Sequence, residues 1–365
     1  MGSSPVIVET PLIDQHRAAG ATLAEFAGVM LPEKFSGERG EYRVARESVA
    51  LFDTNWRAIF SVSGRDAVRY LHAITSNNIR ELAENNGQLA LLLNPQGHIL
   101  AELEIYALKE KLLVLAHAAF RERTFATLKK YILGSQVQLV DVSADFATMA
   151  FEGPQAHAIV AEATGLALDG FSQLASTEVA LCGAPCRLIG RSHFREVGAE
   201  IIAPRQHAAA LWEHLRASVH AQHGLPTGMK ALNALRIEAG IPWFPVDFND
   251  TTIPHEAVVE STHISFTKGC YTGQEIVERV RSRGHVNRKR VNLKFSFAEP
   301  PAPGTKLRAG AVDVGYVSSS AFSPSQNTSI GMGYLRREHN TIGSIVELDG
   351  GTAEVIGVRT TAAGS

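Results

Sequence analysis

The order of apolar patterns along the first third of the chain limits the choice of fold. An alternating run, IFSV, leads into GRDAVRYLHAIT, whose apolar spacing of three and four residues predicts a helix after a glycine turn. LALLLNPQGHILAELEIYAL then predicts two strands joined at a turn from Asn94 to Gly97. KLLVLAHAA predicts a further strand, and FRERTFATLKKYIL an amphipathic helix that ends at Gly134. Strand, helix, three strands and helix together indicate an α+β module.

A second module of the same kind follows. ATMAFEGPQAHAIVAEAT predicts a strand, a Gly-Pro turn and a helix, and APCRLIGRSHFREVGAEIIAP predicts a pair of strands. QHAAALWEHLRASVHAQHG predicts the next helix. Two similarly built halves suggest pseudo-symmetry, although no sequence repeat can be demonstrated. After about residue 290 the pattern changes to short strands rich in Gly, Ser and Pro, which predicts a separate β-barrel domain.

Composition excludes several classes of protein. A chain of 365 residues is long enough for two or three domains with ample buried core. The formal net charge of −2 leaves no chain-wide basic footprint for nucleic acid, and no apolar run approaches the length of a membrane span. The three cysteines fit a reducing compartment, so we expect a cytoplasmic protein. Cys182 and Cys186 have no second pair of ligands nearby in the sequence, so we expect no metal site there.

The third cysteine lies in the stretch KGCYTGQEIVERV. Thr272, followed three residues later by Glu275, predicts a capping box at the start of a helix that ends at Gly284. Cys270 would then lie just before the positive helix end, and Lys268 adds a cation nearby. Both favour the thiolate form of an accessible cysteine, which indicates a reactive residue. The alternative is a small buried hydrophobic side chain, because free cysteine is among the most buried residue types.

Two other stretches place charges in apolar surroundings. HFREVGAEI carries Glu200 between two apolar residues of an expected strand, and ALRIEAGIPWFPVDF carries Arg236 ahead of Trp243 and Phe244. A carboxylate can accept two parallel hydrogen bonds from a ring N–H and an adjacent amino group, the pattern that a pterin presents. An arginine can bind ligand oxygens, and the aromatic residues can stack on a flat ring. The alternative is that Glu200 and Arg236 pair with each other or with backbone in an interdomain seam.

Nearly end to end, the chain resembles the folate-binding superfamily that contains the aminomethyltransferase T-protein of the glycine cleavage system and the YgfZ proteins. The resemblance is carried by TPLIDQHRAAG, FAGVMLPEKF, VALFDTNW, VSGRDAVRYLHAITSNNI, LLNPQGHIL, LRIEAGIPWFPVDF and VGYVSSSAFSPSQNTSIGMGYL. KGCYTGQE is similar to the K-G-C-[FY]-x-G-Q-E signature of the YgfZ branch, whereas T-proteins have a related K-G-x-F-x-G stretch without the cysteine. The signature residues are Lys268, Gly269, Cys270, Tyr271, Gly273, Gln274 and Glu275.

The resemblance also implies a folate site. Glu200 matches the acidic residue that holds the pterin, and Arg236 matches the arginine that contacts folate. His193 falls where T-proteins tend to have a tyrosine, and Asn94 lies in the LLN turn beside the expected pocket. We therefore expect tetrahydrofolate, a reduced folate, as the bound cofactor.

One stretch departs from the T-protein pattern. T-proteins carry a pair of aspartates where this chain has Ala101 and Glu102, and one of those aspartates is needed for chemistry at the substrate. The additional methylene of Glu102 can move its carboxylate by about an ångström, enough to impair a positioned group. Leu89 also stands where an aromatic residue is expected. The resemblance thus implies a folate clamp that is kept and an aminomethyl-transfer site that is impaired.

The implied fold is α+β, with two pseudo-symmetric ferredoxin-like modules and a C-terminal β-barrel, three domains in a ring around a central folate cavity. Chain order predicts a discontinuous folate-binding domain from residues 1–55 and 142–289, a second α+β module at 56–141, and the barrel at 290–365.

The implied function is a tetrahydrofolate-binding accessory protein that supports assembly or repair of iron–sulfur proteins, with Cys270 and Lys268 as the reacting residues and iron–sulfur client or assembly proteins as partners. One alternative is an aminomethyltransferase, so whether the protein is an enzyme stays open. Another is a binding protein linked to tRNA modification, through the basic run Arg279 to Arg290. We do not expect direct nucleic-acid binding there, because the helix dipole favours cations at a helix C-terminus.

Overall fold

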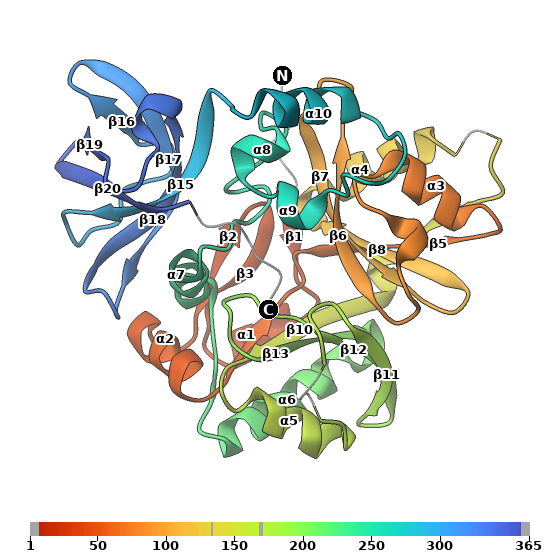
Figure 1. Cartoon of the computed structure of the whole chain (residues 1–365). Coiled ribbons are helices and arrows are strands. Elements are labelled where there is room, and N and C mark those ends of the chain that lie inside the picture. Colours follow the sequence, from red (N-terminus) through yellow and green to blue (C-terminus); the bar gives the residue numbers. More distant parts are fainter. Residues whose placement is uncertain (1–6, 133, 168–170, 359–365) are drawn as a thin grey trace. The chain divides into compact units, whose positions relative to one another are not determined.

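The computed structural model describes residues 7–132, 134–167 and 171–358. Figure 1 shows its helices and strands, coloured along the sequence. The chain divides into two compact units. Unit 1 comprises Met1–Leu71, Ile79–Gln88 and Leu103–Leu232, and unit 2 comprises His72–Asn78, Leu89–Glu102 and Asn233–Ser365. Within the described ranges, no helix is both long and apolar enough to cross a lipid bilayer. The domain boundaries expected from chain order stay a prediction.

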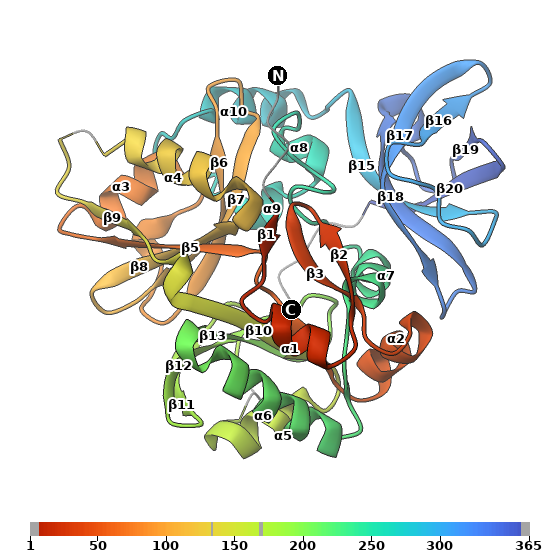
Figure 2. The same cartoon turned by 180° about the vertical axis from the view of Figure 1, so that it is seen from behind.

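Unit 1 contains a six-stranded sheet in the order β11-β12-β13-β10-β4-β14, antiparallel except for the β4–β14 pair. Its strands are β4 (Ala50–Asp53), β10 (Phe146–Glu152), β11 (Ser176–Leu181), β12 (Ala184–Gly190), β13 (Gly198–Pro204) and β14 (Leu225–Pro226). Helices α5 (Ala156–Thr164) and α6 (Ala208–Ala221) lie on the same side of the sheet in both views (Figure 2).

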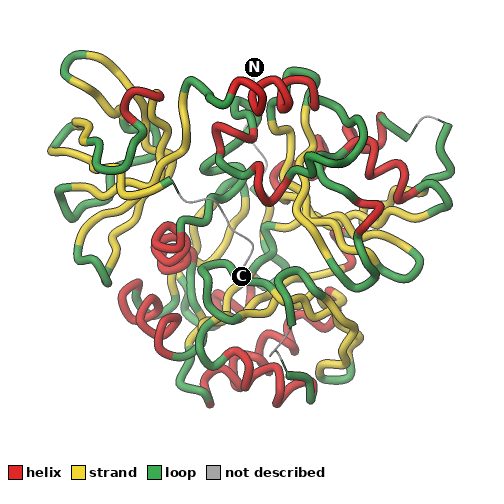
Figure 3. Tube along the Cα trace, in the orientation of Figure 1, coloured by secondary structure: helices red, strands yellow, loops and turns green. Residues whose placement is uncertain are grey.

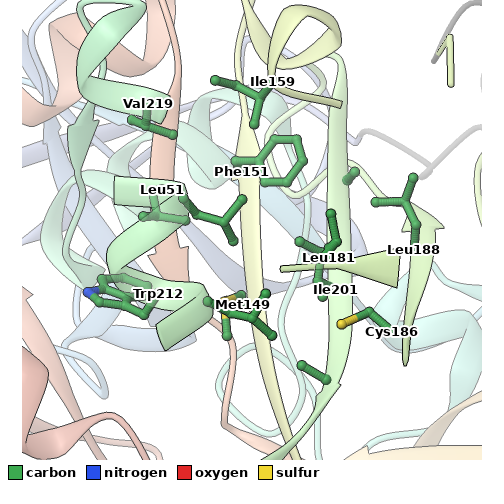
Figure 4. Close-up of a cluster of buried hydrophobic side chains, with 14 of the residues drawn as sticks. Leu51, Met149, Phe151, Ile159, Leu181, Cys186, Leu188, Ile201, Trp212 and Val219 are labelled. Atoms are coloured by element: carbon green, nitrogen blue, oxygen red, sulfur yellow. The ribbon is translucent and has the colours of Figure 1, made fainter. Parts of the chain in front are cut away.

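The main core of unit 1 lies between that sheet and those two helices (Figure 4). Leu51, Met149 and Phe151 from the central strands pack with Ile159 of α5 and Trp212 of α6. Alternate positions of a strand point to the same face, so the spacing of Met149 and Phe151 directs both toward the helices. Burying a large apolar side chain of this kind contributes about 1.5–3 kcal/mol.

A five-stranded sheet has the order β6-β7-β8-β5-β9. Its strands are β5 (Arg57–Ser63), β6 (Gly87–Leu93), β7 (Ile99–Ala107), β8 (Lys111–His117) and β9 (Gln138–Asp141), and the neighbouring helices in the chain are α3 (Ala67–Ile74) and α4 (Arg121–Lys130). The turn predicted between β6 and β7 is confirmed, because the N–H of Gly97 donates to the carbonyl of Asn94 at 2.9 Å. This turn belongs to unit 2.

The N-terminal part of unit 1 adds a small sheet in the order β1-β3-β2. Its elements are β1 (Val8–Glu9), α1 (Ile13–Ala18), β2 (Thr22–Phe26), β3 (Val29–Lys34) and α2 (Glu38–Glu47). Asp53 fixes the first segment to the six-stranded sheet, because its carboxylate binds the buried Thr10 hydroxyl at 2.5 Å and His16 Nε2 at 2.7 Å. These buried polar contacts set the path of the chain into unit 1.

Unit 2 contains a closed barrel in the order β15-β18-β17-β16-β19-β20. Its strands are β15 (Arg288–Phe295), β16 (Lys306–Ala309), β17 (Val312–Ser323), β18 (Thr328–Arg336), β19 (Ile345–Leu348) and β20 (Gly351–Gly357). Apart from a single-turn helix at Arg337–His339, its described residues are strands and loops (Figure 3). A Cβ atom on Gly331 would lie 2.6 Å from the carbonyl oxygen of Ser319 on the neighbouring strand β17, so the close approach of β17 and β18 at this point requires glycine.

Before the barrel, the chain contributes short helices to unit 2. These are the end of α7 (Met229–Ala239), then α8 (Pro254–Ala257), α9 (Glu260–His263) and α10 (Gln274–Arg283). The expectation of a mixed α+β fold with a closed C-terminal β-barrel is confirmed.

Candidate functional site

A network of buried charges lies in unit 1 around the predicted pterin acceptor. Glu200 of β13 accepts hydrogen bonds from Arg57 of β5, Nε to Oε1 at 2.6 Å and Nη2 to Oε2 at 2.9 Å. Arg57 Nη1 also donates to Glu104 of β7 at 3.0 Å, and Glu104 accepts further bonds from Arg191 and from the Tyr106 hydroxyl. Arg57, rather than Arg236, is therefore the partner of Glu200.

Opposing effects set the ionisation of this network. Burial raises the pKa of Glu200, but the facing Arg57 guanidinium outweighs burial and holds that pKa well below its usual range. Burial likewise raises the pKa of Glu104, and Arg191 and Arg57 together lower it further than burial raises it. Both carboxylates are therefore ionised at neutral pH, and each has a cation within hydrogen-bonding distance.

His193 lies at the edge of the network. Its Nε2 atom is 3.5 Å from Glu200 Oε2 and, among the described residues, has no hydrogen-bond partner. The ring packs edge-on against Phe52 and Trp56. Burial lowers the pKa of His193, so the imidazole is neutral at pH 7 even though Glu200 favours the charged form. An unpaired buried polar atom beside Glu200 is the kind of unmet hydrogen-bonding capacity that a ligand can satisfy.

The loop that carries His193 is held by a carboxylate. Glu152, at the end of β10, accepts backbone N–H groups of His193, Phe194 and Glu196 and the hydroxyl of Ser192. Complete burial raises the pKa of Glu152 to about 7, although these hydrogen bonds act in the opposite direction. Glu152 thus positions His193 against Glu200.

Arg236, the predicted folate contact, lies in unit 2 with its guanidinium fully engaged. Nη1 donates to the carboxylate of Asp247 and to the Ile241 carbonyl at 3.1 Å, and Nε and Nη2 both donate to Asn233 Oδ1. The guanidinium also stacks on the Trp243 ring at 4.6 Å. Because Arg236 is completely buried, its observed partners all belong to the protein interior. A direct folate contact from Arg236 stays a prediction.

Asp247 connects that arginine to the barrel. In addition to Arg236, its carboxylate accepts the Trp243 N–H at 3.0 Å and the hydroxyls of Ser318 and Ser319 at 2.7 and 2.6 Å. Burial raises the pKa of Asp247, and Arg236 with the two serines lowers it to a net value below the usual range. This buried pair is satisfied on both sides, which is the condition for an internal ion pair to be tolerated.

Glu102, which departs from the aspartate pattern, has a partner that sequence reasoning did not identify. His263, the last residue of α9, places Nε2 at 2.9 Å from Glu102 Oε1. The other ring nitrogen lies 3.1 Å from the Val259 carbonyl and 2.7 Å from the Thr262 hydroxyl. The His263 side chain is 3% exposed and the Glu102 side chain 27% exposed. A buried imidazole therefore fixes one oxygen of a carboxylate that is still accessible to solvent.

The structure corrects the expected start of α10. The helix is capped by Gly273 at φ 84°, with no side-chain cap, so the capping box predicted from Thr272 and Glu275 is wrong. The left-handed conformation suits glycine, and a Cβ atom at Gly273 would lie 2.6 Å from the Asn94 carbonyl oxygen. The predicted end at Gly284 is confirmed by its φ of 74°. Asn94 thus shapes the turn that packs under the motif, and its Oδ1 accepts the His98 N–H.

Cys270 and Lys268 are two residues apart but differ in their exposure to solvent. Cys270 is exposed, as expected for a reactive thiol. Lys268 is buried, where its Nζ donates to the carbonyls of His72 and Thr75 and lies 4.8 Å from the Tyr271 ring centroid. The ammonium group of Lys268 therefore anchors the motif to the end of α3. Among the described residues, no group of three or more His, Cys, Asp or Glu side chains is arranged to hold a metal ion.

The basic run after α10 is partly used inside unit 2. Arg288 pairs with Glu256 at 3.1 Å, and Arg290 is buried and donates to the Ala257 carbonyl at 2.8 Å. Arg281 stacks on the Phe266 ring at 4.5 Å. Cations engaged in this way are less available to phosphates of a nucleic acid than a freely solvated basic tail.

Sequence reasoning missed Arg57, Glu104, Glu152, Asp247 and His263. Each has one local signal, a polar residue inside or at the end of an apolar strand or an aromatic loop, as in NWRAIF, AELEIY, MAFEGP, PVDF and THISF. A buried charge needs a partner, but no local signal says which residue supplies it.

Comparison with family models and with known proteins gives the same family for this chain. The GCVT N-terminal domain matches residues 12–267, and the glycine cleavage T-protein C-terminal barrel domain matches residues 288–361. The aminomethyltransferase of Saccharopolyspora erythraea is 30% identical over 344 residues, which cover 93% of each chain. That of Desulfitobacterium hafniense is 26% identical over 340 residues, again 93% of each chain.

A solved structure supports the same relationship. The crystal structure of glycine cleavage system aminomethyltransferase T from Bartonella henselae matches with a TM-score of 0.87 and 25% identity, covering 98% of this chain and 99% of that one. These names support the aminomethyltransferase alternative better than the iron–sulfur accessory function that the cysteine motif suggests. With both of its domain models matched, the chain belongs to the GCVT family of the folate-binding aminomethyltransferase superfamily.

Proposed function

We propose that this protein is an aminomethyltransferase that uses tetrahydrofolate, with Glu102 as the carboxylate that serves the chemistry. The observation that carries the proposal is the contact between Glu102 and His263, because a carboxylate that is both held and accessible is what the aspartate of T-proteins would otherwise supply. The names of the related proteins support the same reaction class.

The reaction requires proton transfer at the attacking nitrogen. An aminomethyl group on the sulfur of a carrier reacts with the two nitrogens of tetrahydrofolate to give methylenetetrahydrofolate, ammonia and the free carrier thiol. The two folate N–H protons balance the ammonia and the thiol, so no oxidant or reductant is needed. A carboxylate near the reacting nitrogen can accept a proton and stabilise developing positive charge, and positioned acid–base groups of this kind contribute about 10²–10⁴-fold to rate.

His263 answers the objection that glutamate is longer than aspartate. A free glutamate side chain has many rotamers, and a displacement of about an ångström is costly for a catalytic group. The buried imidazole removes much of that freedom by holding Oε1, and its other nitrogen is fixed by α9. In this proposal Glu102 is the catalytic residue and His263 is a positioning residue.

Glu200 and His193 supply the proposed pterin-binding edge. A carboxylate has about four acceptor sites, and Arg57 occupies two of those on Glu200. The remaining sites and the unpaired His193 Nε2 fit the donors and acceptors along a pterin edge. We assign the pterin contacts to Glu200 and His193 rather than to Asn94 or Arg236, because polar atoms of Asn94 and Arg236 have protein partners.

The test is a direct assay of methylenetetrahydrofolate formation from an aminomethylated lipoyl carrier. We expect turnover by the wild type and about a hundredfold lower kcat for Glu102→Gln, with little change in KM for tetrahydrofolate. The matched control is Glu110→Gln, since Glu110 is exposed on the loop that follows the same strand. Absence of turnover by the wild type, with folate binding intact, would reject the enzyme and leave folate binding standing.

A second candidate function is a YgfZ-like role in assembly or repair of iron–sulfur proteins, operating in the cytoplasm. The observation that favours it is the exposed Cys270 within KGCYTGQE, a signature that the T-protein branch lacks. Its test is complementation: in cells that lack the endogenous factor, wild type should restore activity of an iron–sulfur enzyme and Cys270→Ala should not. Equal rescue by both chains would remove this candidate.

A further inference from the structure

A cleft of about 310 Å³ lies in unit 2, and its lining does not include Glu102, His263 or Cys270. Residues of α8, α9, the loop that follows, the end of α10 and the start of β15 line it. Its apolar lining comes from Phe266, Val280 and Val286. This volume is at the lower end of the range for small-molecule sites in proteins.

Two polar atoms in the lining have unmet hydrogen-bonding capacity. Oε2 of Glu260 and Nδ1 of His255 are buried, and neither has a hydrogen-bond partner within the part of the chain that the structure describes. Burial raises the pKa of Glu260, and burial together with Lys289 lowers that of His255. Most buried polar groups in proteins are hydrogen-bonded, so a pair of unpartnered atoms in one cleft points to a ligand.

The same cleft is lined by a lysine side chain, that of Lys289. Lys289 lies between Arg288 and Arg290, which bind Glu256 and the Ala257 carbonyl. The side chain of Lys289 lines the cleft, where its charge acts on Glu260 and His255, and it forms no ion pair or hydrogen bond within the described ranges. Lys289 and Arg281 place two cations in the lining beside the carboxyl group of Glu260, and this excess of positive charge favours an anion.

The cleft also has one wall formed by the side chains of Phe266 and Arg281. The guanidinium of Arg281 lies 4.5 Å from the ring centroid of Phe266, and both side chains line the cleft. Stacked guanidinium and aromatic planes are suited to a planar ligand, which can contact either face.

We propose that this cleft binds a small planar organic anion that also carries an N–H donor. The N–H group donates to Glu260 Oε2, the carboxylate or phosphate pairs with Lys289, and the ring contacts the wall formed by Phe266 and Arg281. A nucleoside monophosphate such as GMP is an anion of this kind, and tryptophan, although a zwitterion, offers the same combination of an anionic group, a planar ring and a ring N–H. The inference does not rest on the aminomethyl-transfer reaction.

Calorimetric titration of the full chain with GMP, tryptophan and inorganic phosphate tests the proposal. We expect one-site saturation with at least one of the two ring ligands, and phosphate at least about tenfold weaker, since a tenfold change corresponds to about 1.4 kcal/mol. Glu260→Gln and Lys289→Gln should each weaken that ligand about tenfold or more. Lys294→Gln is the matched control, because Lys294 is an exposed lysine of the same strand that does not line the cleft.

The outcomes separate the possibilities. Binding of GMP alone supports the cleft as a nucleotide site, and binding of tryptophan alone supports it as an amino-acid site. No saturation by either up to about 10 mM, or equal affinity in both lining variants, overturns the proposal. Loss of binding after saturation with tetrahydrofolate would also overturn it, by making the cleft part of the folate site. Thermal unfolding checks each variant, and Phe266→Leu, which leaves the buried polar atoms in place, substitutes for any variant that fails to fold.

Discussion

Each unit contains a buried ion pair, and the two pairs differ in how fully the carboxylate is hydrogen-bonded. Asp247 in unit 2 accepts hydrogen bonds from Arg236, a backbone N–H and two serine hydroxyls, and the guanidinium is satisfied as well. Glu200 in unit 1 accepts hydrogen bonds from Arg57, and the Nε2 atom of a neutral His193 lies 3.5 Å away at the limit of hydrogen-bonding distance. We call the Asp247 pair saturated, because its polar atoms are already hydrogen-bonded and it can act only in stability. We call the Glu200 pair unsaturated, because the Glu200 carboxylate can still accept hydrogen bonds from a ligand.

Breaking the saturated pair should have the largest effect. Asp247→Asn leaves Arg236 buried without a counter-ion, so we expect the free energy of unfolding to fall by about 3–5 kcal/mol, measured by urea denaturation. The control is Asp349→Asn, which removes an exposed partner of Arg308 and should change stability by no more than about 0.5 kcal/mol. Similar effects of the two changes would contradict the anchoring role of Asp247.

Acid should weaken unit 1 before it affects the Asp247 pair. Burial, with the nearby Arg57, lowers the pKa of His117 to about 4, and its Nδ1 accepts the Ala119 N–H in the neutral form. A histidine whose pKa is depressed on folding adds stability above its unfolded pKa of about 6.5, and that stability is lost as pH falls toward 4. The loss is on the order of 3 kcal/mol, because one pKa unit corresponds to about 1.36 kcal/mol.

Urea denaturation at several pH values between 7 and 4 measures this loss. His117→Asn keeps a hydrogen-bond acceptor at the cap but cannot titrate, so its stability should decline less steeply across the window. His157→Asn, at an exposed position of α5, should follow the wild type. A His117→Asn curve parallel to the wild-type curve would show that this imidazole is not the titrating group.

The unsaturated pair should respond in ligand binding. Glu200→Gln presents an amide donor where the pterin edge needs an acceptor, so tetrahydrofolate affinity should fall by about 1.5–3 kcal/mol. Calorimetric titration measures the change, and Glu178→Gln, an exposed carboxylate of β11, is the control. Equal affinities for wild type and Glu200→Gln would remove Glu200 from the folate site.

The smallest expected change in stability is at Cys270. Cys270→Ala should shift the free energy of unfolding by no more than about 0.5 kcal/mol and leave folate affinity nearly unchanged, because the side chain is exposed. In the wild type, iodoacetamide should modify Cys270 faster than Cys182 and much faster than Cys186, whose burial raises the thiol pKa to about 11. Peptide mapping after brief alkylation gives the order, and an inert Cys270 would argue against a reactive thiol.

Local patterns predicted the features that depend on neighbouring residues. The turn from Asn94 to Gly97, the end of α10 at Gly284 and the change to short strands in the barrel all follow from residue types within a few positions. The start of α10 was missed because Gly273 is chosen by its close approach to the Asn94 carbonyl, a distant contact that overrides the capping preference of Thr272.

Partners of buried charges could not be predicted in the same way. Glu200 lies 143 residues from Arg57, and Glu102 lies 161 residues from His263. The resemblance to T-proteins identified Glu200 as a match to the pterin-holding residue and Glu102 as a departure from the family pattern, but nothing in a single sequence assigns the complementary side chain. The identity of the arginine or histidine that contacts each carboxylate depends on the fold of the whole chain.

The 161-residue separation of Glu102 from His263 has a consequence for synthesis on the ribosome. Translation at about 5–20 residues per second leaves an interval of roughly 8–32 seconds between the two residues. During that time unit 1 can be completed, since its last segment ends at Leu232, while His72–Asn78 and Leu89–Glu102 wait for the rest of unit 2. Glu102 therefore stays without its final histidine partner until α9 has been synthesised, and slower translation before residue 263 would lengthen that interval.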